Sequence, residues 1–361
     1  MANFTGRLNV NEVIGALYNM IISQYVFADN VSGLDSTLVD MARVDGGMYG
    51  DTKLYIATDA LKSVEWGADD EAENLLQTHR PDAPKTQAIT LDTFRQISLT
   101  IDNYMSKRAF QDEGIFSEFN SVLLGWVGDT KDIYDTTTYN TFIGTHTATG
   151  AAQNIFVTLP VVEGDAEATN RLQALTIAQK VADVLVDVKD VSRDYNDNGF
   201  IRAFKPEDMV LVWNAEVYNK ITKLDLPTIF HKEGLFDGIK QYVLPAKYFG
   251  EVNTEGGVSD SLNLRTRVLA EGDYAGEHLF AGELFKDDES YGGNTTYNVN
   301  PNIACKIMHK NSVPYMSAFE VGTSFFNPKS LTENHYLTFG RNELEHLANY
   351  PFITITANPA S

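Results

Sequence analysis

The chain has 361 residues, of which 43% are hydrophobic, and a formal net charge of −21. A chain of this length can bury a large core and divide into two subdomains. The negative charge repels nucleic acid at long range and no cluster of Lys and Arg offsets it, which argues against sequence-specific binding of DNA or RNA. The single cysteine excludes an internal disulfide.

The sequence contains no run of about 18 apolar residues, which is the length that a membrane span needs. Its first residues, MANFTGRLNVNE, lack the basic and apolar regions of a signal peptide. We therefore expect no membrane span and no export, and a protein that is made and kept in the cytoplasm.

Residues 1–52 are predicted to form an N-terminal arm with one short helix. Asn11 can cap this helix, and its apolar face comprises Val13, Ile14, Leu17, Ile21 and Tyr25. Because so small a face gives the arm little core of its own, we expect neighbouring chains to hold it in place.

Residues 53–101 are predicted to form a long β-hairpin. A strand at 53–57 is followed by a longer strand at 85–101, whose apolar residues fall on alternate positions. The insertion between the strands is rich in charge, and its tip, residues 65–84, carries the acidic cluster Asp69, Asp70, Glu71 and Glu73. A protruding two-stranded hairpin is marginally stable alone, so we expect it to contact another subunit.

A long helix is predicted over residues 117–143. Its apolar stripe recurs every three or four residues and comprises Phe116, Phe119, Leu123, Trp126, Val127, Ile133 and Tyr134. Trp126, at the middle of the stripe, is expected to pack between the helix and a sheet, while Asp135 faces the other way. Gly125 and Gly128 are costly in a helix, which favours close approach of another backbone there. The threonines at 136–138 disfavour helix, so the pattern does not define where the helix ends.

The second half of the chain mixes helices with many strands. A strand at 154–160 precedes a helix at 171–191, whose predicted apolar stripe is Leu172, Leu175, Ala178, Val181, Leu185 and Val188. A buried strand at 209–213 leads directly into a helix at 214–224 capped by Asn214. Further strands are predicted within residues 241–249, 264–270, 278–285, 302–310 and 350–357. These elements predict an α+β fold.

One stretch matches the first half of a calcium-binding EF-hand loop. Asp194, Asn196, Asn198 and Gly199 occupy the expected positions. The twelfth position is Lys205, where calcium needs a carboxylate with two ligating oxygens. We therefore expect a plain turn that caps the preceding helix.

No other pattern predicts catalysis or metal binding. The acidic pairs Asp69/Asp70 and Asp287/Asp288 lie in polar loops, where a solvated surface is expected. The histidines of the chain are His79, His146, His231, His278, His309, His335 and His346. None of them are spaced as metal ligands such as HxxxH are. No GxSxG or Walker sequence occurs.

Two further groups of residues have an ordinary structural explanation. Cys305 is flanked by residues typical of a strand, and we expect it to be buried rather than nucleophilic. Four aromatic residues lie close together in the sequence: Tyr315, Phe319, Phe325 and Phe326. They could line a ligand pocket, but packing in the core is favoured. We therefore expect no catalytic residue, no cofactor and no bound metal, and a protein that is not an enzyme.

The order of these parts resembles that of the major capsid proteins of tailed bacteriophages, which have the HK97-like fold. The stretches that carry the resemblance are GDTKLYIAT at 50–58, QAITLDTFRQISLTID at 87–102, IYDTTTYNTFIG at 133–144 and PEDMVLVWNAEVYNKI at 206–221. The resemblance implies an N-terminal arm at 1–52, an extended hairpin loop at 53–101, a peripheral domain with a spine helix at 102–206, an axial domain at 207–325 and strands returning to the peripheral domain at 326–361.

The resemblance also implies a function. The chain would be a self-assembling subunit that forms hexamers and pentamers of an icosahedral head, encloses double-stranded DNA, and is assembled in the host cytoplasm. A portal and a decoration protein would be further partners. Because only about fifty residues precede the hairpin, we expect no cleaved leader and a separate scaffolding protein. Lys62 and Lys85 flank the loop that some relatives crosslink, but no partner Asn or catalytic Glu is identified.

Two other functions remain open: an encapsulin-type shell of a bacterial compartment, which shares the fold, and a hydrolase whose site the sequence does not reveal. The capsid is favoured over the compartment because the chain is long and its hairpin carries a large charged insertion. It is favoured over the hydrolase because no pair of nucleophile and base is found.

Overall fold

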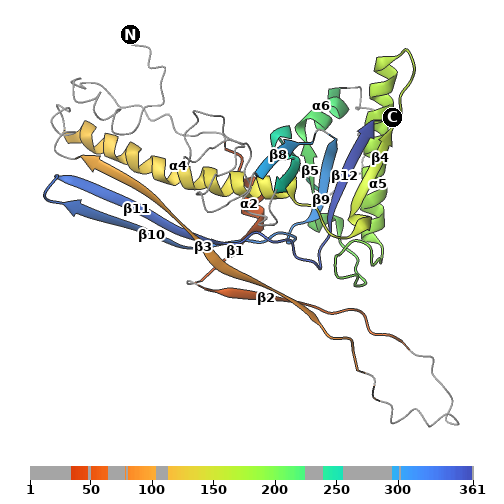
Figure 1. Cartoon of the computed structure of the whole chain (residues 1–361), viewed down its shortest axis with the longest axis horizontal. Helices are drawn as coiled ribbons and strands as arrows, with labels where there is room; N and C mark the ends of the chain where they lie inside the picture. The colour runs from red at the N-terminus through yellow and green to blue at the C-terminus, as the bar shows by residue number, and fades with distance from the viewer. Residues whose placement is uncertain are drawn as a thin grey trace.

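The computed structural model describes residues 34–47, 50–63, 78, 80–102, 113–223, 239–254, 295–300 and 302–359. The predicted helix after Asn11, the strands at 264–270 and 278–285 and most of the hairpin tip lie outside these residues. In the described part, two sheets lie side by side and one long helix, α4, reaches from one to the other (Figure 1). None of the described helices is long and apolar enough to cross a membrane.

The first sheet contains the predicted hairpin. Its described strands, in spatial order, are β1 (Arg43–Asp45), β10 (Tyr315–Asn327), β11 (Thr332–Asn342), β3 (Lys85–Asp102) and β2 (Thr52–Ala57). The start of β3 pairs antiparallel with β2, and the rest pairs antiparallel with β11. The hairpin is therefore confirmed, and Ile89, Leu91, Leu99 and Ile101 are buried at alternate positions as predicted. The residue pattern did not predict β10 or β11, although the resemblance implied returning strands within 326–361, where β11 lies.

The second sheet is covered on both faces. Its described strands, in spatial order, are β4 (Asn154–Leu159), β12 (Phe352–Pro359), β9 (Ile303–His309), β5 (Met209–Asn214) and β6 (Lys240–Leu244). Met209, Leu211 and Trp213 belong to one core cluster, whereas Val210 and Val212 belong to another. A strand whose alternate residues enter two cores must be apolar throughout, which explains why β5 was recognisable. Cys305 is buried in β9, as expected.

Helices pack on each face of this sheet. α5 (Ala166–Lys189) and α6 (Ala215–Lys223) cover one face, and α2 (Thr37–Ala42) and the end of α4 cover the other. α5 begins earlier than predicted because the Asp165 carboxylate accepts a hydrogen bond from the Ala168 N–H at 2.9 Å. Asn214 caps α6 as predicted, accepting from the Glu216 N–H at 3.1 Å. The remaining described elements are the paired strands β7 (Gly250–Thr254) and β8 (Thr295–Val299), and the short helices η2 (Ala151–Gln153), η3 (Pro206–Asp208) and η4 (Ala246–Tyr248).

α4 (Glu113–Thr145) confirms the predicted long helix and extends beyond it. Its 33 residues span about 50 Å at ~1.5 Å per residue. The helix continues through the threonine run because residues 134–144 are buried on all sides, so packing outweighs their weak helix propensity. The Thr141 hydroxyl donates to the Thr137 carbonyl at 2.6 Å, which satisfies this group inside the core.

The predicted orientation of α4 is wrong at two positions. Trp126 is 38% exposed rather than packed in the core, and Asp135 is buried rather than facing solvent. The reason is that α4 is buried on all sides only in its C-terminal third. Its middle part lies over β10 and β11 of the first sheet and leaves its other side exposed. The side chains of Phe116, Phe119 and Leu123 lie outside the described residues.

The close backbone approach occurs at a different glycine of α4. A Cβ atom added to Gly125 or Gly128 would meet no described atom within 4 Å, whereas one at Gly144 would lie 1.9 Å from the Tyr248 carbonyl oxygen. Gly144 therefore lets the segment at Tyr248 pack directly on the helix. Among the described residues, no backbone approaches Gly125 or Gly128 closely, so the contact predicted there is not found in this part of the chain.

The apolar stripe of α5 was predicted correctly at Ala178, Val181 and Val188 but was misplaced at the start of the helix. Leu172 and Leu175 are exposed, and the buried residues are Ala174, Ile177, Ala178, Val181, Val184 and Val188. Both sets repeat every three or four residues, so periodicity alone could not choose between them. The buried alanines and β-branched residues pack on the sheet, and the two leucines at the start of the helix remain outside this core.

Candidate functional site at the base of the hairpin

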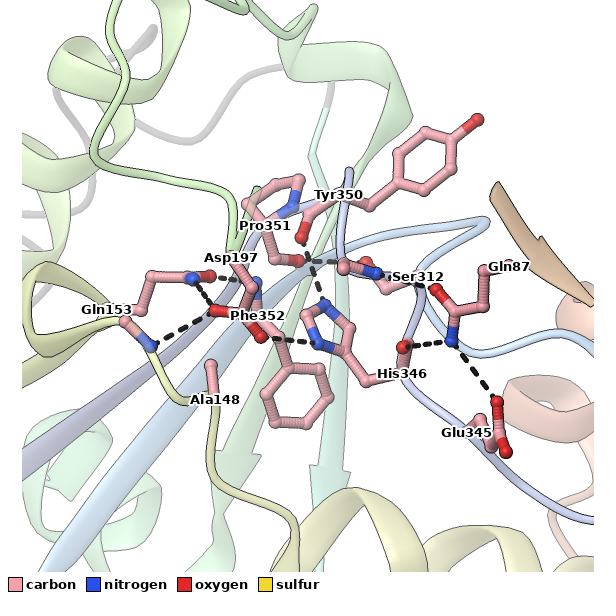
Figure 2. Close-up of polar contacts among 12 residues, drawn as sticks. Gln87, Ala148, Gln153, Asp197, Ser312, Glu345, His346, Tyr350, Pro351 and Phe352 are labelled. Carbon is pink, nitrogen blue, oxygen red and sulfur yellow. Dashed lines mark hydrogen bonds and ion pairs between the residues drawn. The ribbon is translucent and has the colours of Figure 1, made fainter. Parts of the chain in front are cut away.

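The hairpin meets the second sheet at a junction of polar side chains (Figure 2). β3 contributes Gln87, and the loop before β12 contributes His346. The turn after α5 contributes Asp197, and η2 contributes Gln153. These residues come from four distant parts of the sequence, so the junction exists only in the folded chain.

Gln87 attaches β3 to the loop before β12. Its side-chain amide donates to the His346 carbonyl at 2.9 Å and to the Glu345 carboxylate at 3.2 Å, and its carbonyl oxygen accepts from the Ala348 N–H at 3.1 Å. One side chain thereby satisfies two backbone groups of a loop that has no strand partner at these positions. Figure 2 shows Gln87 between this loop and β3.

His346 and Asp197 form the centre of the junction. The His346 Nε2 lies 3.0 Å from the Tyr350 carbonyl, which can only accept, so Nε2 carries a proton. The Nδ1 atom lies 3.6 Å from the Asp197 carboxylate. The ring therefore lies between a backbone carbonyl and a carboxylate, both of which are acceptors.

Asp197 is held in its ionised form by several donors. Its carboxylate accepts from the Gln153 amide at 2.7 Å and from the Gly150 N–H at 3.1 Å. Burial alone would raise the pKa of Asp197, but hydrogen bonds from His346, Thr149 and Gly150 outweigh this effect and hold the pKa well below its ordinary value. The carboxylate fastens the turn after α5 to the loop after α4.

The other strand of the hairpin is anchored on the same turn region. The Asp59 carboxylate, just past β2, accepts from the Ile201 N–H at 2.9 Å and from the Arg193 guanidinium at 2.7 Å. These two bonds lower the pKa of Asp59 to about 2. Arg202 donates to the Thr58 carbonyl. Both strands are thus fixed, and a cavity of about 350 Å³ lies between them and the loop that contains Tyr350.

The turn that resembles an EF-hand loop uses its polar groups internally. The Asn196 amide donates to the Phe200 carbonyl at 2.7 Å and accepts from the Phe200 N–H at 2.8 Å, and Gly199 adopts a φ of +67°. Asp197, between the predicted ligand positions, points into the junction. No group of three or more His, Cys, Asp or Glu side chains in the described part of the chain could hold a metal ion. That the turn binds no calcium stays a prediction.

A second polar cluster fixes α4 to the first sheet. The buried Asp135 carboxylate accepts from the Tyr315 hydroxyl and lies 3.5 Å from both Arg43 and Lys131. Burial, and next the negative charge of Asp135, raise the pKa of Tyr315 well above its ordinary value. The cluster joins α4 to β1 and β10. The two cations compensate the charge of the buried Asp135 carboxylate, so no further positive group is needed to stabilise it.

Sequence spacing could not reveal that two histidines meet in the core. The ring of His146 stacks on Phe142 at 4.9 Å and lies 5.3 Å from the ring of His346. Lys306, buried in β9, donates to the His146 carbonyl at 2.6 Å. Burial, together with the nearby His346 and Lys306, lowers the pKa of His146 to about 3, so this ring is neutral near neutral pH.

The predicted site residues are widely separated in the structure. Tyr315 is buried, but Phe325 and Phe326 are exposed on β10, so the expectation that all these aromatic residues pack in a core is wrong. The acidic pairs Asp69/Asp70 and Asp287/Asp288, together with His79, His231 and His278, lie outside the described residues. The sequence analysis missed Asp59, Gln87 and Asp197, and only Asp59, directly after a predicted strand, carried a signal.

Comparisons with known proteins agree with this architecture. The sequence matches the family of Phi29-like phage major capsid proteins over residues 3–342, and no curated protein matches it. The fold is similar to the capsid structure of Staphylococcus phage Andhra at 12% identity, with a TM-score of 0.61 over 99% of this chain and 88% of the other.

Two other solved structures give similar values. A chain in the structure of the head fiber and inner core protein of native bacteriophage P68 has 13% identity and a TM-score of 0.64, over 93% of this chain and 87% of that chain. The capsid structure of the Cyanophage P-SCSP1u has 12% identity and a TM-score of 0.51, over 99% and 100%. The α+β capsid fold that the sequence implied is therefore confirmed.

Proposed function

We propose that copies of this chain form hexamers and pentamers of an icosahedral head. The premise is that the chain belongs to the family of Phi29-like phage major capsid proteins. Membership makes the chain a structural subunit of a phage head shell and places it in the virion capsid. The compartment shell and the hydrolase are not favoured, because the family is one of phage capsid proteins.

The hairpin is the observation that carries this proposal. Leu54 and Ile56 on β2 are 58% and 63% exposed, although they alternate as the residues of a covered strand do. Two anchors, at Gln87 and Asp59, hold the base of the hairpin on the rest of the subunit. A hairpin that is fixed at its base and uncovered on an apolar face is suited to contact a neighbouring subunit.

Further partners follow from the resemblance and from the charge. The head would enclose double-stranded DNA, and a net charge of −21 suits a container that must not bind its contents tightly. A separate scaffolding protein, a portal and a decoration protein would complete the assembly in the host cytoplasm. The division into arm, hairpin loop, peripheral domain and axial domain belongs to the same proposal.

The proposal is tested by replacing residues 65–84 of the hairpin tip with a short Gly-Ser turn. We expect a soluble, folded subunit with nearly unchanged circular dichroism, and shells that fail to form or dissociate at lower temperature. The carboxylates of the acidic cluster repel one another unless a neighbouring subunit supplies Lys or Arg. Each exposed ion pair with a neighbour contributes only about 0–1 kcal/mol, but the contribution recurs in every subunit.

Two outcomes would contradict the proposal. Unfolding of the shortened subunit would place the tip in its own core, and shells of normal stability would show that the tip makes no important contact between subunits. A matched control replaces Glu163, in the exposed turn before α5, by Ser, which leaves the hairpin loop and β10 intact.

A further inference from the structure

β10 has an open edge over its second half. β1 pairs with β10 only from Tyr315 to Ser317. From Val321 to Asn327, the only described strand that pairs with β10 is β11. Figure 1 shows this part of β10 at the outer border of its sheet. The backbone N–H and C=O groups on the outer side can therefore pair with another strand.

The open segment lacks the features that keep edge strands from pairing. Residues 321–327, VGTSFFN, contain no charged residue and no proline, although charged residues and prolines are the usual means of blocking an edge. Val321, Phe325 and Phe326 are 39%, 63% and 49% exposed. An uncharged segment of this kind promotes aggregation if it stays uncovered. A specific partner strand removes this hazard.

We propose that this edge pairs with the same edge of a second copy, antiparallel and around a two-fold axis. The inference rests on the proposed function, because shell formation brings copies of the chain together. A two-fold contact uses the same surface on both subunits, so that surface must be complementary to itself. Strand addition of this kind joins two sheets through main-chain hydrogen bonds.

The flanking charges select the antiparallel arrangement. Glu320 precedes the open segment and Lys329 follows it, and both are exposed. Antiparallel pairing places Glu320 of each copy at the end where the partner's Lys329 lies, whereas parallel pairing would bring like charges together. Glu320 also lies 3.4 Å from Lys131 of its own chain, but more than half of its side chain stays exposed and can interact with a second cation.

The side chains fit one register in particular. With Ser324 opposite the partner's Ser324, the whole segment 321–327 is paired, and Gly322 lies opposite the partner's Phe326. A Cβ atom at Gly322 would meet no described atom within 4 Å, so there is room for an aromatic ring above this glycine. A large ring over a glycine is a known way to stabilise paired strands.

A single cysteine substitution tests this register. Directly opposed residues of antiparallel strands have Cα atoms about 4.5–5.5 Å apart, which a disulfide can bridge. We expect shells of the full-length Ser324→Cys variant, oxidised with glutathione disulfide, to yield a crosslinked dimer on a non-reducing gel. Thr323→Cys is the matched control, because its two copies would be displaced by two residues, or about 7 Å along the strand. The native Cys305 is buried and does not interfere.

Charge variants give a second readout in the Ser324→Cys background. Lys329→Glu should lower the dimer fraction, and adding Glu320→Lys should restore it, because opposite charges then meet again in exchanged positions. The pairing is refuted if Ser324→Cys shells stay monomeric on the gel while the new thiol reacts with maleimide, or if Thr323→Cys crosslinks equally well. If the wild-type chain forms no shells, the proposed function itself fails.

Discussion

Replacing Gln87 by alanine should loosen the base of the hairpin without unfolding the subunit. The substitution removes three hydrogen bonds, of 2.9, 3.1 and 3.2 Å, to the loop before β12. Each hydrogen bond contributes about 0.5–1.5 kcal/mol net, so the anchor loses about 1.5–4.5 kcal/mol. Since about 1.4 kcal/mol corresponds to a factor of ten, local opening of the hairpin base should increase at least about tenfold.

Amide hydrogen exchange measures this opening directly. The amides of β2 and of residues 85–90 should exchange faster, while those of β5 and β9, which are buried in the second sheet, keep their rates. Gln96→Ala is the matched control on the same strand, because the Gln96 amide donates a hydrogen bond to the Thr338 hydroxyl at 3.1 Å, far from the junction. Equal exchange in the two variants would refute the role assigned to Gln87.

Three further predictions concern α4, the core histidines and the turn after α5. Gly144→Ala should destabilise the subunit by more than about 3 kcal/mol in urea unfolding because its Cβ would collide with the Tyr248 carbonyl. Gly128→Ala, with open space around it, should stabilise by about 1 kcal/mol; equal effects would show that the contact at Gly144 is not tight. His146 has a pKa of about 3 in the folded chain against 6.5 unfolded, so its contribution to stability is complete above pH 6.5 and is lost as the pH falls towards 3. His146→Leu should flatten the pH dependence of urea unfolding in this range, and an unchanged pH profile would argue against this assignment. Asp194→Asn should leave shell melting unchanged with or without calcium, because Lys205 cannot close a calcium site; a calcium-dependent shift abolished by the substitution would overturn this.

The elements that sequence reasoning found are those whose pattern follows from burial on a single sheet. The alternation of Ile89, Leu91 and Leu99 gave β3, and the continuous apolar run at residues 209–213 gave β5. The residue pattern did not reveal β10 and β11, because much of their length is exposed and polar and shows neither alternation nor an apolar run. Trp126 was misplaced because periodicity identifies a stripe but not which part of a long helix another element covers.

The junction could not be predicted for a different reason. Gln87, Asp197 and His346 are ordinary polar residues in their local sequence, and their roles arise from contacts between segments more than a hundred residues apart. The EF-hand pattern drew attention to the correct turn but to the wrong carboxylate. Asp197, which no position of that pattern singles out, holds the turn to the loop after α4.

The position of the two anchors determines how the hairpin can move. The register between β3 and β11 is interrupted between Thr93 and Leu91, which leaves Asp92 as a bulge whose carboxylate accepts from the Glu343 N–H at 3.1 Å. Beyond this bulge Leu91 still pairs with Asn342 of β11, and from Thr90 to Lys85 β3 pairs only with β2 among the described strands. A bulge bends a strand and weakens its ladder locally, so bending at Asp92 would break the contacts of Gln87 and Asp59 but spare the long ladder between β3 and β11. The first sheet and the hairpin can therefore change their angle at one residue, and the junction stabilises one of the possible angles. A shell subunit that meets its neighbours in more than one geometry, as in the proposed hexamers and pentamers, can use this bulge without repacking either core.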